Sequence, residues 1–596
     1  MDMLDALALR LRVGNRTVFG IMLISAAFVL ILRLLGPLTM RWDLSIQIEA
    51  AYRLTQGLGL TNAFTSQLDL NQPPVAEQLT HFPPGLPLLV AGFLWLKMPL
   101  AIAFKIIYGL TTVVGWLGWS VIASHCLTRP LKIAGRRIAA NYVTAALLPI
   151  FYTPPWMLQG TDIFLWSGVP IVLLLLVPTS VRGQQNLSAV LPGLLVVALL
   201  SVRYASGFLV LTALGIIVYT DYPHFKSMLK RVLAFMLPLL LVIASAVFFT
   251  VVISGDAVGQ AASPNLLETH GSRYLESTLL AWIQSSLSRV FYSLSNLFFL
   301  TGINIKRLDL LAGYPNIVSD ILGFIFFILI TVCCLLTLKK KKSFVRGFGA
   351  ELLTAIAISL ISFFIFSVLL AFIVAYSPFV LERYYLPVKT CFIILMYAVA
   401  SSIKFDALLK YLATLFVLVF FAYNFAQPIY YLFSQDGDSR ILKALELSGI
   451  SEIHAPRPDV PYPSNEVLVI HPKSLELMRA IEQQEPDALF FVQSYPVYMG
   501  YTRFDDPQNF RRIPDNSFWE KAYLSEPTKI YWVVNEELCS EICASRGNFN
   551  SDHPEFPISS LMSLPNLETI FASPEDKARI MVSELPAGYR FSPVEE

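Results

Sequence analysis

The chain has 596 residues, of which 55% are hydrophobic and only 14% charged. A water-soluble globular chain carries about 25% charged residues, so this composition excludes that class and predicts a multi-pass membrane protein. Residues 1–430 hold 30 Lys and Arg against 16 Asp and Glu, whereas residues 431–596 hold 14 against 26. We therefore predict a basic transmembrane domain over 1–430 and an acidic, solvated α/β domain over 431–596.

The first long apolar run, residues 18–38, follows Arg10, Arg12 and Arg16. It is too long for a signal peptide, so it predicts an uncleaved helix with a cytoplasmic N-terminus. Asp43 then lies at the outer end, at the start of a helix over 43–54 within an external segment of residues 39–83. Glu49 is rotated about 240° from Asp43 on that helix, so we expect it to be a solvated neighbour.

The next apolar stretches predict a long series of membrane spans. Residues 84–98 are short and rich in Pro, and they are interpreted as a partial or interfacial helix. A basic loop at Lys226, Lys230 and Arg231 and the Lys339–Lys342 cluster mark the cytoplasmic side. The count is about 11 spans, or 13 if residues 84–98 and 288–303 also cross. Expected spans within the chain include residues 101–126, 142–153, 163–177, 187–202, 205–220, 233–254, 317–338, 351–376, 386–403 and 411–430.

The acidic tail shows strand patterns at residues 466–470, 488–492 and 529–534 and a helical pattern at 474–483. Cys126, Cys333, Cys334 and Cys391 fall in or beside apolar runs and are expected to be small buried hydrophobic residues. Cys539 and Cys543 would be able to form a disulfide if the tail lies outside the cytoplasm.

Several polar residues gather at the predicted outer face. Acids there are able to take a proton from a hydroxyl group, and arginines match phosphate through their planar fork. Each residue also has a plainer interpretation, because interfacial acids often begin helices and interfacial arginines often anchor headgroups. The set consists of Asp43, His81, Asp162, Arg203, Glu382 and Arg383.

Five motifs occur in order along the predicted membrane domain. They are Arg41-Trp-Asp43, His81-Phe-Pro-Pro-Gly-Leu-Pro87, Gly160-Thr-Asp162, Arg203-Tyr204 and Glu382-Arg-Tyr-Tyr-Leu-Pro387. Together they resemble the C superfamily of glycosyltransferases (GT-C), which use polyprenyl-phosphate sugars, and in particular bacterial protein mannosyltransferases and aminoarabinose transferases. The tail around residues 486–503 also resembles the extracytoplasmic tail of some bacterial members.

The resemblance implies an inverting transfer of a sugar from a polyprenyl-phosphate carrier to an acceptor at the outer face of a bacterial inner membrane. Asp43 matches the family's first-loop acid, the general base, and Asp162 its second acid. Arg203, Arg383 and His81 stand where groups that handle phosphate are expected. The chain has one acid at position 43, where protein mannosyltransferases have an adjacent pair, which leaves a protein acceptor open beside a lipid or a glycan. We expect no organic cofactor and no nucleic-acid partner. The sequence carries no metal-binding signature, and dependence on a divalent metal stays open.

Two other classes use similar lipid carriers. A flippase or transporter for lipid-linked saccharides would need polar residues along a path through the membrane, but here the interior runs are largely apolar. A polysaccharide ligase or polymerase would have a large external loop rich in Arg, whereas residues 255–316 contain few. Both remain alternatives to the transferase.

Overall fold

The structure is a computed structural model, and it describes several stretches of the chain and a few single positions outside them. The chain forms two compact units, one of residues 1–36 and 104–448 and the other of residues 37–103 and 449–596. The described stretches are residues 42–65, 68–72, 75–79, 82–127, 132–133, 136–137, 161–177, 189–222, 224–248, 317–344, 348–373, 385–400, 480–492, 510–512, 522–535, 564–573 and 578–591.

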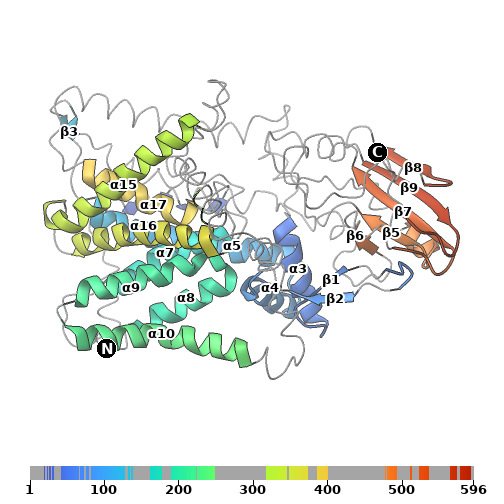
Figure 1. Cartoon of the computed structure of the whole chain (residues 1–596), viewed down its shortest axis with the longest axis horizontal. Helices are drawn as coiled ribbons and strands as arrows, with labels where there is room; N and C mark the ends of the chain where they lie inside the picture. The colour runs from blue at the N-terminus through green and yellow to red at the C-terminus, as the bar shows by residue number, and fades with distance from the viewer. Residues whose placement is uncertain are drawn as a thin grey trace. The chain divides into compact units, whose positions relative to one another are not determined.

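The first unit is helical (Figure 1). Its elements are most of α5 (Leu100–Cys126), the short strands β3 (Lys132–Ile133) and β4 (Arg136–Arg137), α7 (Asp162–Leu176), α8 (Val190–Val202), the 3₁₀ turn η3 (Tyr204–Gly207), α9 (Phe208–Asp221), α10 (Phe225–Phe248), α15 (Ile317–Phe344), α16 (Phe348–Ile373) and α17 (Leu386–Ala400).

Four helical stretches in the described part of the chain are long and apolar enough to cross a membrane. They are Ile102–Cys126, Tyr204–Asp221, Phe225–Ala244 and Phe348–Leu370. At a coarse level this agrees with the predicted class: the described part of the protein is mostly helical, with four candidate membrane-spanning helices and a small sheet. The full count of 11 to 13 spans stays a prediction, and so does the orientation.

Helix packing relies on small residues and on indole hydrogen bonds. A side chain at Gly193 of α8 would clash with the carbonyl oxygen of Phe235 in α10, so only glycine allows these two helices to approach so closely. The indole N–H of Trp119 in α5 donates to the carbonyl oxygen of Trp166 in α7 at 3.1 Å. The Trp166 indole N–H in turn donates to Thr390 Oγ1 of α17, also at 3.1 Å. Two buried hydrogen bonds therefore connect α5, α7 and α17.

The sequence prediction was wrong at the start of α10. We expected Lys226, Lys230 and Arg231 to form a loop, but the structure continues the helix from Phe225 through all three residues. Lys226 and Lys230 are exposed and Arg231 is buried. Because Lys226 and Lys230 are one turn apart, they share the outer face of the helix, while Arg231 is rotated by about 100° toward its interior side.

The second unit combines the segment after the first apolar run with the tail. Its N-terminal part consists of α3 (Trp42–Thr55), an antiparallel hairpin of β1 (Thr61–Thr65) and β2 (Val75–Gln78), and α4 (Gly85–Trp95). With 11 residues, α4 is about 16 Å long, too short to span a hydrocarbon core of about 30 Å. This agrees with the partial helix expected over residues 84–98.

A five-stranded sheet forms the tail's part of the second unit (Figure 1). The strand order is β6-β5-β7-β9-β8, with β5 parallel to β6 and β7, and β9 antiparallel to β7 and β8. The strands predicted over 488–492 and 529–534 are confirmed as β5 and β7. The bounds are β5 Leu489–Val492, β6 Phe510–Arg512, β7 Thr528–Asn535, β8 Glu568–Ser573 and β9 Ala578–Leu585.

The predicted division at residue 430 stays a prediction. The structure adds that residues 37–103 share a compact unit with residues 449–596. The four cysteines expected to be buried are buried, each with a free thiol: Cys126, Cys333, Cys334 and Cys391. Cys539 and Cys543 lie outside the described residues.

Candidate functional site

Asp162 and Arg203, both predicted as site residues, form an ion pair in the helical unit. The distance from Arg203 Nη2 to Asp162 Oδ1 is 2.8 Å. Arg203 Nη1 also donates to Thr161 Oγ1 at 2.7 Å. The Asp162 side chain is only 4% exposed and that of Arg203 15%, so the pair is largely removed from solvent.

The two residues meet because α7 and α8 run in opposite directions. Asp162 is the first residue of α7, where the partial positive charge of the helix N-terminus favours a carboxylate. Arg203 follows the last residue of α8 in an extended conformation, with φ −154° and ψ 119°. This extended residue separates α8 from η3. Its side chain contacts the first residue of α7.

Thr161 occupies the N-cap position of α7 without making a side-chain capping hydrogen bond. Its hydroxyl oxygen accepts from Arg203 instead. Both terminal nitrogens of Arg203 therefore hold oxygens of the α7 start. Arg203 therefore orients Asp162 at the start of α7.

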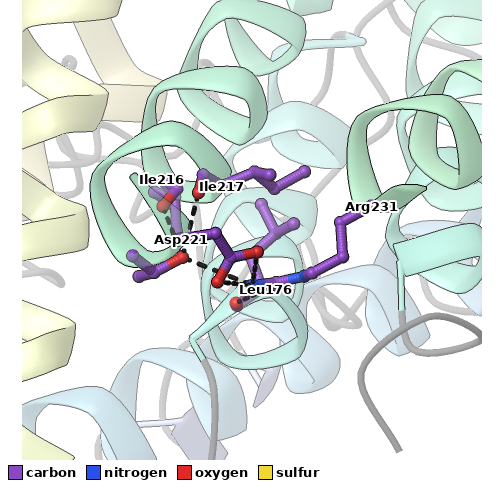
Figure 2. Close-up of polar contacts among 6 residues, drawn as sticks. Leu176, Ile216, Ile217, Asp221 and Arg231 are labelled. Carbon is purple, nitrogen blue, oxygen red and sulfur yellow. Dashed lines mark hydrogen bonds and ion pairs between the residues drawn. The ribbon is translucent and has the colours of Figure 1, made fainter. Parts of the chain in front are cut away.

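A second ion pair occupies the other end of α7 (Figure 2). Arg231 Nη1 lies 2.9 Å and 2.8 Å from the two carboxylate oxygens of Asp221, the last residue of α9. Arg231 Nη2 donates to the carbonyl oxygen of Leu176, the last residue of α7, at 3.4 Å. The Arg231 and Asp221 side chains are 3% and 9% exposed. Arg231 thus joins the C-terminal ends of α7 and α9 to the start of α10.

This second pair was missed by sequence reasoning, which assigned Arg231 to a solvated loop. The available signal was the i, i+4 spacing of Lys226 and Lys230, which is typical of one exposed helix face and leaves Arg231 off that face. Asp221, directly after the predicted span 205–220, was the other signal, since an acid at the end of such a run needs a partner.

The other predicted site residues are placed less fully. Asp43 is the second residue of α3, in the other unit, and only its backbone is described. His81 and Arg383 lie outside the described residues. The expectation for Glu49 was wrong, because it is 5% exposed. Helix α3 packs against both α4 and β1, so more than one of its faces is covered.

Within the described residues no group of three or more His, Cys, Asp or Glu side chains could hold a metal ion. Comparison of the chain with protein-family models and with curated proteins found no match. The function is therefore argued from the residues themselves and from the resemblance of the ordered motifs.

Proposed function

We propose that the protein is a membrane glycosyltransferase of the GT-C type. It would move a sugar from a polyprenyl-phosphate carrier to an acceptor at the outer face of a bacterial inner membrane. The observation that supports this best is the largely buried pair of Asp162 and Arg203 at the adjoining ends of two apolar helices. Buried ionic groups in apolar helices are costly, and they commonly mark functional sites.

In the proposed reaction the acceptor hydroxyl oxygen attacks the anomeric carbon of the sugar, and the carboxylate of Asp43 takes the hydroxyl proton. The bond between the anomeric carbon and the phosphate oxygen breaks, and its electron pair leaves on the lipid phosphate. Asp162, oriented by Arg203, positions the acceptor or the base. Arg203, Arg383 and His81 would stabilise the charge that develops on the phosphate.

The proposal includes the finer membrane arrangement, with 11 to 13 spans, a cytoplasmic N-terminus and residues 431–596 outside the cytoplasm. It is supported by the basic residues that follow the expected inward spans, above all the Lys339–Lys342 cluster at the end of α15. The ends of α7 carry different partners, Arg203 at its start and Arg231 at its end.

The direct test is incubation of the purified protein in lipid vesicles with a polyprenyl-phosphate hexose labelled in the sugar. We expect release of polyprenyl phosphate together with transfer of label to acceptors extracted from a bacterial envelope. Movement of the intact labelled lipid across the bilayer without bond cleavage would contradict the proposal and favour a transporter. Joining of whole saccharide chains without use of the single-sugar donor would favour a ligase or polymerase.

A further inference from the structure

The tip of the β1–β2 hairpin is built into the C-terminal sheet's hydrophobic core. Leu70 is fully buried among side chains of the tail that include Phe491 and Trp532. Leu70 and these two residues are separated by more than 400 positions in the sequence. A leucine enclosed in this way contributes about 2 kcal/mol through burial alone, so the tip is part of the sheet's core and not a contact at its edge.

Main-chain hydrogen bonds fix the tip at both sides of Asp69. The N–H of Leu70 donates to the carbonyl oxygen of Tyr523 at 3.0 Å. The N–H of Tyr523 donates to the carbonyl oxygen of Leu68 at 2.8 Å. Asp69 forms a parallel bridge with Tyr523. Asp69 Oδ1 also accepts from the backbone N–H of Ser525 and from that of Asn71, both at 3.2 Å. The carboxylate therefore holds the tip's own turn and the tail together.

Asn71 adds side-chain bonds to the same segment of the tail. Its Nδ2 donates to Thr528 Oγ1 at 2.5 Å, and its Oδ1 accepts from the backbone N–H of Glu526 at 3.2 Å. Thr528 is the first residue of β7, the central strand of the sheet. The tip is thus bonded to the most enclosed strand of the tail.

The other end of the hairpin is attached to the helix that carries Asp43. Arg53, in the last turn of α3, donates from Nε to Thr61 Oγ1 of β1 at 3.1 Å. Arg53 is 6% exposed, so this bond is shielded from water. A continuous path of contacts leads from α3 through the hairpin to the core of the C-terminal sheet.

We propose that residues 68–72 act as a clamp through which the C-terminal sheet positions α3. Asp69, Leu70 and Asn71 are positioning residues that act through α3. The clamp's effect on turnover rests on the proposed function, because it requires Asp43 to be the base. Its effect on the position of α3 does not.

Hydrogen exchange of the unmodified full-length protein tests the clamp itself. We expect the amides of residues 68–72 to exchange about as slowly as those of β7, residues 528–535, because they unfold together. Exchange of residues 68–72 at the rate of an unprotected loop, with β7 protected, would overturn the proposal whether or not the protein is a transferase.

The positioning role is tested with a nitroxide label at Gln56, an exposed residue just after α3, introduced as Gln56→Cys with Cys539 and Cys543 changed to Ser. Asp69→Ala should increase the label's mobility and lower kcat about tenfold at unchanged KM for the donor. Asp69→Asn keeps an acceptor oxygen and should show the label mobility and the kcat of the protein with Asp69. The control is Glu526→Ala, which removes an exposed side chain and keeps the N–H that binds Asn71.

An unchanged label mobility in folded Asp69→Ala would overturn the positioning role. A change in mobility with the wild-type kcat would overturn the clamp's effect on turnover, since the tail would then hold α3 without serving catalysis. If the wild-type protein transfers no sugar, the proposed function fails, and the mobility and exchange measurements still decide the clamp.

Discussion

Arg203 Nη2 lies 2.8 Å from Asp162 Oδ1, which joins the residue after α8 to the first residue of α7. The contact connects positions 41 residues apart, and both were singled out from the sequence for their place at helix ends. The two side chains depend on each other, because neither charge could remain largely buried at low cost without its partner.

Removing one member of this pair should be costly. Asp162→Ala leaves the Arg203 guanidinium largely buried beside apolar helices, and we expect a loss of about 3 kcal/mol, the lower end for broken buried pairs because Arg203 keeps some exposure. Thermal unfolding in detergent measures it. The matched control is Asp487→Ala, which removes a carboxylate from an exposed turn; an equal loss in both variants would count against a specific role for the pair.

The pair at the other end of α7 allows a double-mutant test. Arg231→Met should lower stability by about 3–5 kcal/mol because both oxygens of the buried Asp221 carboxylate lose their charged donor, Arg231 Nη1. Arg231→Met combined with Asp221→Leu should recover much of that loss, since no uncompensated charge remains. Losses that simply add in the double variant would show that the two side chains are not coupled.

Close approach of α8 and α10 predicts a strong effect of one methyl group. Gly193→Ala places a Cβ against the Phe235 carbonyl oxygen and should destabilise the protein by about 1–3 kcal/mol. Gly92→Ala is the control, because a Cβ at that helical position meets nothing within 4 Å. It should be neutral or slightly stabilising. The measurement is the change in unfolding temperature for each variant.

The C-terminal sheet contains a pH-dependent contact at its surface. Lys529 Nζ lies 2.7 Å from Glu485 Oε1, and Tyr531 donates to Glu485 Oε2 at 2.7 Å. The hydrogen bond from Lys529 lowers the pKa of Glu485, and the bond to Glu485 raises the pKa of Lys529. Their contribution is therefore present between about pH 5 and 10, and it is lost as pH falls through the lowered pKa of Glu485 or rises through the raised pKa of Lys529.

Glu485→Gln should accordingly unfold at a slightly lower temperature than the wild-type protein at pH 7. The difference should be much smaller at pH 3. Both side chains are about one-third exposed, so the effect at pH 7 is a few tenths of a kcal/mol. A larger difference at pH 3 than at pH 7 would show that the sign of this argument is wrong.

Helix positions followed from the sequence where apolar runs end at charged residues. The start of α7 at Asp162 and the break at Arg203 were expected because hydropathy alone places them. The 2.8 Å contact between them was not expected in detail, because hydropathy sets the ends of a helix and not its neighbours.

The contacts of the second unit were beyond sequence reasoning for a similar reason. Leu70 lies in a short polar stretch in which Leu68 is the other apolar residue, and two positions are too few to show the periodicity that identifies a core strand. Its partners lie more than 400 residues away. Glu49 was misjudged because rotation relative to Asp43 gives its face on α3 but not what covers that face.

The most direct test of the account is the rate of sugar transfer by Asp43→Asn in vesicles with a labelled polyprenyl-phosphate hexose. Asparagine has the shape of aspartate but cannot accept the acceptor's proton, so we predict a loss in kcat of at least about 100-fold. The protein should be folded, with the unfolding temperature of the wild type, and the control Asp487→Asn should keep full activity. Transfer by folded Asp43→Asn at the wild-type rate would contradict the assignment of Asp43 as the base.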